Sequence, residues 1–573
     1  MINFYDFEVF KYDWLVVIIN PFNKEVVKIH NDVGKLKQYY KDHKHEIWSG
    51  FNVRHYDQWI FKALLCGFDA WKINDFIINK GCAGYQFSSL LNKIQLINYD
   101  VMLLNSSLKQ LEGFQGHNIH ESSVDFRIDR ELTKAEIAET FTYCQNDVEE
   151  AINVWLEKKS DFDAQMQLVK MFNLPVSAMG KTKAQISAQI LECEYVKRDD
   201  EWDLYVLNCI QFKKEKYREV ANWFLNEKNH SYQNKLNVDV AGIEHSISWG
   251  GIHGAKEKYH YKCKDGYLLI HIDVESYYPR LMIWHNLLTR NAKRPERFKD
   301  MFNLRMELKH AGKKKEQAPL KIVINGTFGI CKDKNNPAYD PRNANLICIN
   351  GQLMLIDLIE KLEDIPTFEL IQSNTDGLII KIHKDYFDMV DDACYEWEKR
   401  TDMILAFDFI KEIYQKDVNN YLFIEHSGKV ERKGAYVKEL SKIDYDLPII
   451  NEALVNYMLD RTPIETTISK CDELIKFQKI CKLTSKFDYV AHNGKRYYNK
   501  CYRIFADSRP DADTVYKIKT VKNEPRYFKF ANTSVNSFIE NGDIIGAKVP
   551  EYLNKQWYID LAYERLEQYG FNK

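Results

Sequence analysis

Residues 268–279 (LLIHIDVESYYP) constrain the fold of this chain more than any other stretch. Their Leu, Ile and Val residues predict a buried strand that ends on Asp273, followed by a tight turn that contains Tyr278 and Pro279. A sheet holds a carboxylate rigidly at the end of a strand, which is what a metal-dependent site facing a cleft requires. Asp273 alone is also explained as a turn or cap residue, so the metal-site interpretation depends on further acids.

A second acid stands at the tip of a predicted hairpin. Residues 368–382 (FELIQSNTDGLIIKI) form two apolar runs around the turn-forming sequence Asn374-Thr375-Asp376-Gly377. This arrangement predicts two antiparallel strands with Asp376 in the connecting turn. Asp273 and Asp376 are therefore candidates for one shared metal site.

Two helices, the first of them basic, are predicted between these acids. Residues 294–315 are rich in Lys and Arg, and Pro319 is expected to open a second helix over residues 320–331. Arg305 and Lys309 are four residues apart, as are Lys321 and Asn325, so each pair shares a helical face. A charged run is usually a solvated face, so these cations indicate a binding site only if an anion is available to them.

The N-terminal third contains a separate group of acids. Asp6 and Glu8 are one residue apart on a predicted strand and share a face, and Asp57 stands at the start of a predicted helix. Residues 132–154 predict a helix that carries Tyr143 and Asp147 on one face. Each acid alone is explained by a solvated strand or a helix cap, whereas together they predict a site for divalent cations. Residues 108–126, rich in Gly, His and Ser, are expected to form a loop without chemistry.

Six segments, taken in order, resemble family B (polymerase alpha-like) DNA polymerases with a proofreading 3′–5′ exonuclease of the DEDD type that carries tyrosine. The exonuclease motifs are matched by Asp6-x-Glu8, by Asn52-x-x-x-Tyr56-Asp57 and by Tyr143-x-x-x-Asp147. The polymerase motifs are matched by Asp273-x-x-Ser276-x-Tyr278-Pro279, by Lys321-x-x-x-Asn325-Gly326-x-Phe328-Gly329 and by Asn374-Thr375-Asp376-Gly377. Two positions depart from the last motif, because Asn374 replaces the usual first aspartate and Gly377 the usual serine.

The resemblance implies roles for these residues. Asp273 and Asp376 would bind two Mg²⁺ or Mn²⁺ ions in the polymerase site, and Lys321 would bind the triphosphate and act as an acid toward pyrophosphate. Tyr278 would exclude a ribose 2′ hydroxyl, with Arg305, Lys309 and Asn325 completing the nucleotide site.

In the exonuclease site, the resemblance implies that Asp6, Glu8, Asp57 and Asp147 bind two further ions. Tyr143 would orient the attacking water.

Further residues are implied or predicted to contact DNA. In the exonuclease these are Asn52 and Tyr56, which would hold a frayed 3′ end. Gly250 and Gly251, in a glycine-rich turn that is otherwise a linker, and Lys433 and Tyr436 match family positions near the primer. Lys495 and Arg496 stand in a basic and aromatic stretch that suits phosphate contact or, alternatively, a solvated strand.

Length and charge agree with several domains that hold a polyanion. At 573 residues the chain exceeds one core, and its net charge is −2. Residues 1–150 hold 16 basic and 21 acidic residues, whereas residues 482–529 hold 12 basic and 5 acidic ones. Twelve cysteines without a Cys-x-x-Cys pair argue against a zinc site or a disulfide framework.

The expected fold class is a mixed α/β and α+β multidomain chain, with an RNase H-like exonuclease followed by a right-hand polymerase. The expected domains are the exonuclease (1–158), a helical connector (159–250), palm with motif A (251–290), fingers (291–335), palm with motif C (336–440) and thumb (441–573).

The expected function is template-directed DNA synthesis from dNTPs on primer-template DNA, with 3′–5′ proofreading. Alternatives are an exonuclease with an impaired polymerase half, suggested by Asn374, and a non-catalytic primer-template-binding replication protein. The compact size resembles bacteriophage enzymes. A monomer is expected in the cytoplasm, the host's if a phage encodes it, with a processivity factor, helicase or single-strand-binding protein as possible partners and no membrane segment.

The spacing of the polymerase motifs predicts the type of primer. Relatives that start from a protein primer carry long insertions between these motifs. Here only 48 positions separate Asp273 from Lys321, and 55 separate Lys321 from Asp376. Nucleic-acid primers and modest processivity are therefore expected.

Overall fold

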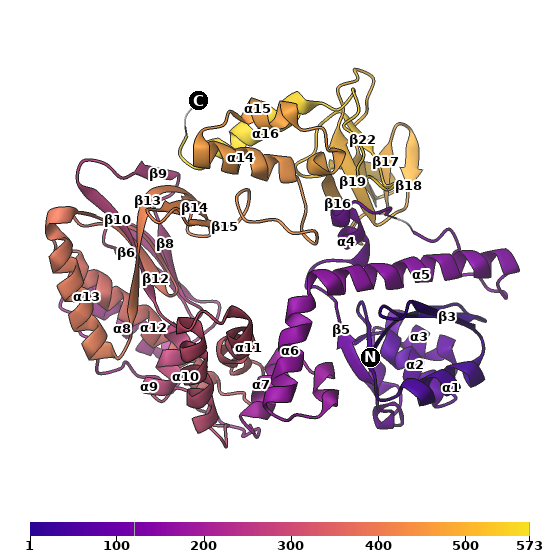
Figure 1. The fold of residues 1–573 in the computed structure, drawn as a ribbon, viewed down its shortest axis with the longest axis horizontal. Helices are drawn as coiled ribbons and strands as arrows, with labels where there is room; N and C mark the ends of the chain where they lie inside the picture. The colour runs from indigo at the N-terminus through magenta and orange to yellow at the C-terminus, as the bar shows by residue number, and fades with distance from the viewer. Residues whose placement is uncertain (120, 572–573) are drawn as a thin grey trace. The chain divides into compact units, whose positions relative to one another are not determined.

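The computed structural model describes residues 1–119 and 121–571, which form two compact units (Figure 1). Unit 1 comprises Met1–Thr182, Leu440–Ile449 and Ile468–Ile559, and unit 2 comprises Lys183–Glu439, Ile450–Thr467 and Asp560–Lys573. The predicted thumb, residues 441–573, contributes to both units. The prediction of a mixed α/β and α+β multidomain chain is confirmed.

A five-stranded sheet organises the N-terminal part of unit 1, with the strand order β3-β2-β1-β4-β5. Its strands are β1 (Ile2–Val9), β2 (Trp14–Asn20), β3 (Glu25–His30), β4 (Ile47–Gly50) and β5 (Ile97–Asp100). The predicted strand that carries Asp6 and Glu8 is confirmed as β1, which pairs antiparallel with β2 and parallel with β4. Side chains of β1 alternate between the faces: Tyr5 and Phe7 pack in one apolar cluster and Phe4 in another.

Helices cover both faces of this sheet (Figure 1). They are α1 (Val33–His43), α2 (Asp57–Leu65), α3 (Ala70–Ile78) and α5 (Lys134–Glu157). α4 (Leu108–Gln115) packs against α5, and Phe162 of α6 (Lys159–Met171) packs on Tyr99 of β5 and Trp155 of α5. The predicted helix over 132–154 is confirmed as α5. It begins with a capping box in which Thr133 accepts from the Glu136 N–H and Glu136 accepts from the Thr133 N–H. Phe4 of β1 packs on Trp155 of α5, so Asp6 and Glu8, on the same face as Phe4, point toward α5.

The expectation of a loop over residues 108–126 is wrong at its start, where α4 forms. The Ser107 N–H donates to Gln110 Oε1 at 3.1 Å, and Gly116 ends the helix in a left-handed conformation with φ +84°. The glycines that suggested a loop therefore belong partly to the end of a helix.

Two small sheets form the C-terminal part of unit 1. One has the order β16-β19-β22, from β16 (Lys479–Lys482), β19 (Cys501–Ala506) and β22 (Ser537–Ile539). The other has the order β18-β17-β20-β21, from β17 (Tyr489–His492), β18 (Lys495–Tyr497), β20 (Tyr516–Val521) and β21 (Glu524–Lys529). Arg503 of β19 is fully buried and donates to the carbonyl oxygens of Gly113 and His117, at the end of α4.

A ten-stranded sheet organises unit 2, with the order β15-β14-β13-β10-β12-β11-β8-β7-β6 and with β9 also paired to β13. Its strands are β6 (Lys235–Val240), β7 (Ile243–Ser248), β8 (Ile252–Ala255), β9 (Tyr259–Lys262), β10 (Tyr267–Val274), β11 (Glu369–Asn374), β12 (Gly377–His383), β13 (Leu405–Asp417), β14 (Asn420–Glu425) and β15 (Val430–Lys433). The predicted strand ending at Asp273 and the predicted hairpin around Asp376 are both confirmed, as β10 and β11–β12.

The helices of unit 2 include α7 (Lys183–Ile190), α8 (Glu215–Leu225), α9 (Tyr277–Trp284), α10 (Glu296–His310), α11 (Lys314–Ile330), α12 (Pro341–Leu362) and α13 (Phe387–Thr401). The expectation that Pro319 opens a helix is wrong, because α11 begins at Lys314 and contains Pro319 in its interior. The missing N–H affects only the first exposed turns, where water can satisfy the free carbonyl. No helix in the described part of the chain is long and apolar enough to span a membrane.

Candidate active sites

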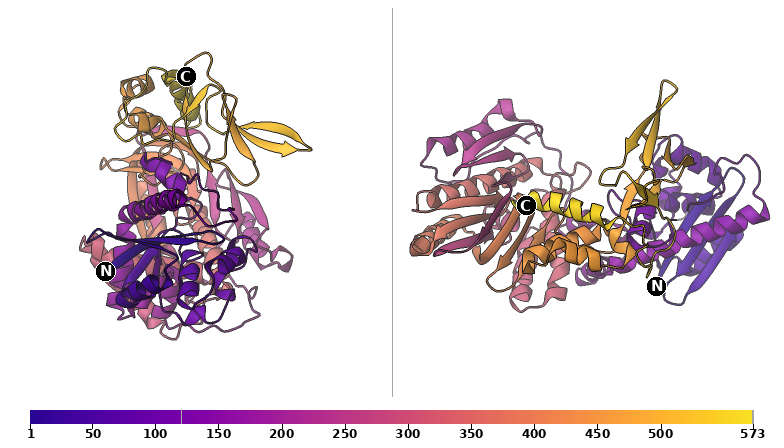
Figure 2. Two further views of the ribbon diagram at one scale, coloured as in Figure 1. Left: turned by 90° about the vertical axis from the view of Figure 1, so that its right-hand side faces the viewer. Right: turned by 90° about the horizontal axis from the view of Figure 1, so that it is seen from above.

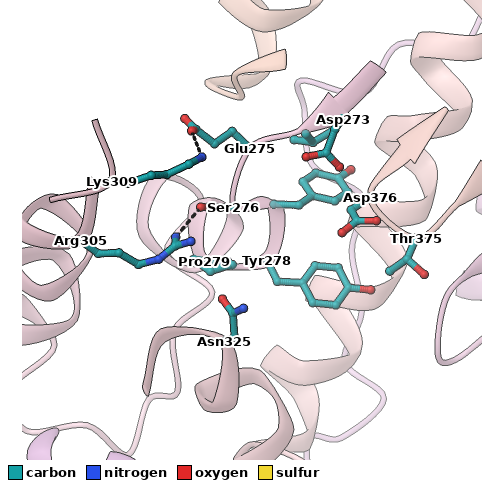
Figure 3. Close-up of a pocket in the computed structure, with 12 residues that line it drawn as sticks. Asp273, Glu275, Ser276, Tyr278, Pro279, Arg305, Lys309, Asn325, Thr375 and Asp376 are labelled. Atoms are coloured by element: carbon teal, nitrogen blue, oxygen red, sulfur yellow. Dashed lines mark hydrogen bonds and ion pairs between the residues drawn. The ribbon is translucent and has the colours of Figure 1, made fainter. Parts of the chain in front are cut away.

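The first candidate site lies at one end of β10 in unit 2. In the antiparallel register Asp273 is opposite Gly377, and the Val274 N–H donates to the Asp376 carbonyl oxygen at 2.8 Å. Main-chain pairing therefore fixes both carboxylates on adjacent segments (Figure 3). A Cβ at Gly377 would lie 3.0 Å from the Ile272 carbonyl oxygen and 3.5 Å from Asp273 Oδ1, so glycine allows this close approach.

The two aspartates have the electrostatics of a cation site. Burial and then the charge of Asp376 raise the pKa of Asp273 to about 7. Partial desolvation raises the pKa of Asp376, although this turn residue is exposed, and the Lys433 ammonium opposes that shift. Asp408 and Glu431 add further negative charge near Asp273. A divalent cation would remove the repulsion, and carboxylate oxygens are the ligands that Mg²⁺ and Mn²⁺ prefer, so the residues fit such an ion.

A cavity of about 370 Å³ opens beside these acids (Figure 3). The residues that line it come from β10, α9, α10, α11 and the β11–β12 turn, namely Asp273, Val274, Glu275, Ser276, Tyr277, Tyr278, Pro279, Arg305, Lys309, Asn325, Thr375 and Asp376. Lys309 Nζ pairs with Glu275 Oε1 at 2.6 Å, and Arg305 Nη1 donates to Ser276 Oγ at 2.9 Å. Two cations of α10 are thus tied to the turn that follows β10.

The predicted nucleotide-binding residues differ in how they face this cavity. Tyr278 lines it and packs its ring 4.6 Å from that of Phe328. Asn325 also lines it, whereas Lys321, one helical turn earlier on α11, is exposed and does not. A Cβ at Gly351 of α12 would lie 3.4 Å from the Tyr278 ring, so that helix supports the tyrosine closely.

Asn374 is directed to the neighbouring strand. Its Oδ1 lies 3.1 Å from Nδ1 of His253 on β8 and accepts from Thr375 Oγ1 at 3.3 Å. The glycine-rich turn lies against the same place: a Cβ at Gly251 would lie 3.4 Å from Thr375 Oγ1, while Gly250 is exposed. The amide at position 374 therefore has a structural use that does not require a metal.

The second candidate site lies in unit 1, between β1, α2 and α5. Asp57 is the first residue of α2, and its Oδ1 accepts from the Phe7 N–H at 3.0 Å, which brings it against β1. Burial, followed by the charges of neighbouring acids, raises the pKa values of Asp6 and Glu8 well above the usual range. Burial raises the pKa of Asp57 to about 7, and burial also raises the pKa of Asp147 above its usual range.

These four acids also fit divalent cations. Asp6 and Glu8 offer carboxylate oxygens within 4.8 Å of each other, so the two groups repel when both are ionised. A bound cation would relieve that repulsion. The Tyr143 hydroxyl hydrogen-bonds to Asp147, so the two residues predicted to share a face of α5 do meet.

Three residues at this second site are absent from the sequence prediction. Lys109 of α4 places Nζ 2.6 Å from Asp147 Oδ1, 2.8 Å from Glu112 Oε1 and 4.6 Å from the centre of the Tyr143 ring. Cys144 donates to Asp6 Oδ2 at 3.5 Å, and Asp6, Glu8 and Cys144 offer ligand atoms within 4.8 Å of one another. The Ser107-x-x-Gln110 cap and Gly116 are the sequence signals that reveal α4 and, with it, Lys109 and Glu112.

Asn52 and Tyr56, the residues predicted to hold a strand end, make hydrogen bonds and packing contacts with other residues of unit 1. Asn52 has a left-handed backbone with φ +63°, and its N–H donates to Asp100 Oδ1 at 2.9 Å. The Tyr56 hydroxyl donates to Asn74 Oδ1 at 2.8 Å, and its ring packs against the apolar cluster behind β1.

The other predicted DNA contacts lie on different elements. Lys433 is the exposed last residue of β15, and its positive charge lowers the pKa of Asp376. The centre of the Tyr436 ring lies 4.2 Å from the guanidinium of Arg565. Lys495 and Arg496 are exposed on β18 of unit 1, in a different unit from Asp273 and Asp376.

No protein-family model matches the chain, and no curated protein is similar to it. Among solved structures, the chain is similar over its whole length to 78% of the family B DNA polymerase of the hyperthermophilic archaeon Pyrobaculum calidifontis. The sequence identity is 13% and the TM-score is 0.42. At these values the likeness carries no argument for fold or activity.

Proposed function

We propose that this chain is a template-directed DNA polymerase that extends nucleic-acid primers with dNTPs and removes mispaired 3′ ends with its own exonuclease. The single observation that carries the proposal is the pairing of Asp273 with Asp376 beside a cavity of about 370 Å³ lined by Arg305 and Lys309. Two carboxylates facing cationic side chains suit a triphosphate whose charge is shared between metal ions and the protein.

In synthesis, Asp273 and Asp376 would hold the ions. Mg²⁺ or Mn²⁺ bound there supplies charge neutralisation and favours the ionised form of the primer 3′ hydroxyl. The hydroxyl oxygen would lose its proton to water and attack the α-phosphorus in line, and the bond between that phosphorus and pyrophosphate would break. To bind the triphosphate oxygens, Lys309 would break its ion pair with Glu275, and Arg305 would break its hydrogen bond to Ser276. The new contacts with phosphate oxygens would be stronger than these two.

Tyr278 would select the sugar. Its ring is held between Phe328 and the close surface of α12, so it cannot move away from a bound nucleotide at low cost. A 2′ hydroxyl would meet this ring, and a deoxyribose would pack on it. The Lys321 side chain is exposed in this structure. Helix α11 would therefore have to move toward the cavity before Lys321 could deliver a proton to pyrophosphate.

In proofreading, Asp6, Glu8, Asp57 and Asp147 would hold the ions that activate water and stabilise the leaving 3′ oxygen. Tyr143 would orient the water through its position beside Asp147, with Asn52 and Tyr56 near the strand end. Lys109 forms ion pairs with Asp147 and Glu112 when no ion is bound. When ions bind to Asp147, the Lys109 ammonium would become free to bind the scissile phosphate.

The experiment that tests the proposal is extension of a labelled primer on a template, with and without dNTPs and Mg²⁺. The proposal expects growth of the primer with dNTPs and shortening from the 3′ end without them. Shortening alone, in a folded protein, would favour the exonuclease with an impaired polymerase half. Neither activity, with binding retained, would favour a non-catalytic primer-template-binding protein.

A further inference from the structure

A two-stranded ribbon in unit 1 has a surface that neither proposed active site uses. It consists of β20 and β21, joined through Lys522 and Asn523, which both have positive φ values of +51° and +65°. All six residues of β21 are exposed, and β21 is the edge strand of its sheet. Figure 2 shows this ribbon, in yellow, extending beyond the other strands of that sheet in both views.

The ribbon is strongly basic. Residues 516–529 contain five basic residues and one acid, Glu524. Lys519 and Arg526 are directly opposite each other across the strands, and like charges in that position destabilise a hairpin. Within the described residues, no carboxylate lies within ion-pair distance of Arg526, so a bound polyanion would relieve this repulsion.

Aromatic side chains are exposed on the same ribbon. Tyr527 is 59% exposed and Phe528 is 41% exposed. They are successive residues of one strand and therefore present rings on opposite faces. Each ring makes an edge-to-face contact with a neighbouring ring. The ring centres of Tyr527 and Tyr516 are 5.6 Å apart, and those of Phe528 and Phe487 are 5.5 Å apart. Because these contacts already restrict the rings, they lose little freedom when they stack on a ligand.

Protection of an edge strand explains only part of this pattern. Lys, Arg and Pro on an exposed edge, as at Arg526 and Pro525, prevent pairing with other chains. Exposed Tyr and Phe rings work against that purpose, because apolar rings on a free edge favour association. Charge for phosphates next to rings for unpaired bases is the combination that single-strand-binding surfaces use.

We propose that the β20–β21 ribbon binds single-stranded nucleic acid, with phosphates at Lys519 and Arg526 and bases stacked on Tyr527 and Phe528. A duplex offers the same phosphates, but its bases are already stacked and cannot cover the rings. This binding goes beyond the proposed function and does not depend on either activity, because no residue of the ribbon belongs to a candidate active site.

Binding is tested on the full chain in EDTA, so that no strand is digested. A single-stranded oligonucleotide that carries 5-iodouracil is irradiated with the protein, and cross-linked peptides are mapped by mass spectrometry. The proposal expects cross-links in residues 524–529. Fluorescence anisotropy then compares the parent with Tyr527→Ser/Phe528→Ser, using Tyr395→Ser as a control because Tyr395 is 56% exposed on α13 of unit 2.

The ring variant, which removes both stacking rings, should bind the single strand at least roughly 30-fold more weakly and bind a duplex of equal length unchanged. The control variant should bind both like the parent. Cross-links confined to other parts of the chain, or equal binding by ring variant and parent, would overturn the proposal. Equal weakening for single strand and duplex would also overturn it, since a charge surface for any nucleic acid would then be the better account.

A charge variant separates binding from folding. Arg526→Glu places opposite charges across from Lys519, so the thermal midpoint of the chain should stay or rise. Single-strand binding should nevertheless weaken, and its dependence on salt concentration should become less steep. Unchanged binding by this folded variant would show that the ribbon does not contact phosphates.

Discussion

Replacement of Asp57 by Asn should stabilise the metal-free protein at pH 8 although it destroys the proposed exonuclease. Burial raises the pKa of Asp57 from 3.8 to about 7. The difference of about 3.2 pH units, at about 1.36 kcal/mol each, makes the ionised carboxylate cost about 4 kcal/mol of folding free energy above pH 7. Asn has no charge, but its buried amide nitrogen restores a cost of about 1–3 kcal/mol. The expected net gain is about 1–3 kcal/mol.

The sign of this effect depends on pH. Because the folded pKa is raised, the carboxyl group contributes its full stability below the unfolded pKa near 4, and that stability is lost as the pH rises from about 4 to about 7. At pH 5 most of the Asp57 carboxyl groups are protonated, so the Asn variant should have no advantage there. Mg²⁺ should raise the free energy of unfolding of the parent at pH 8. The increase should be smaller for the variant, since one ligand of the site is missing.

Urea unfolding, followed by tryptophan fluorescence, measures these differences in EDTA and in Mg²⁺ at pH 5 and pH 8. Asp42→Asn is the matched control, because Asp42 is an exposed acid of α1 and its replacement should change stability by less than about 0.5 kcal/mol. The reasoning is refuted if Asp57→Asn is less stable than the parent at pH 8 in EDTA. It is also refuted if Mg²⁺ stabilises parent and variant equally.

Three further outcomes are expected. Lys109→Met leaves Asp147 and Glu112 without their cation and should destabilise the metal-free protein by about 3 kcal/mol, measured by unfolding in EDTA; an unchanged stability would mean that these ion pairs do not form. Tyr278→Ala should admit ribonucleotides in extension assays, and unchanged discrimination would remove Tyr278 as the selector. Extension should start from nucleic-acid primers with modest processivity, so nucleotide transfer to a protein hydroxyl or synthesis over thousands of nucleotides by the chain alone would contradict the spacing argument.

The main strands and several acids were predictable because local signals were strong. The strand that carries Asp273 near its end combines a continuous apolar run with a turn that contains Pro279. The hairpin at Asp376 has turn residues between two apolar runs. The periodicity of α5 likewise predicted that Tyr143 and Asp147 share a face. Each of these predictions needs only neighbouring residues.

The remaining features depend on contacts that local patterns do not encode. Lys109 reaches Asp147 across 38 residues of sequence, and nothing near Lys109 indicates that partner. The helix that carries it was hidden by glycines, one of which ends the helix. Pro319 misled for the opposite reason, since a proline usually marks a helix start and here lies inside α11. The division of residues 441–573 between two units also follows from long-range packing.

Primer extension by paired variants tests the central claim most directly. Asp273→Asn and Asp376→Asn each remove one charge from the proposed polymerase site and should reduce extension by orders of magnitude while 3′ digestion continues. Asp6→Ala with Glu8→Ala should have the opposite effect, with digestion lost and extension retained. Normal extension by Asp376→Asn, or loss of both activities together in either folded variant, would contradict a chain with two separate metal-dependent sites.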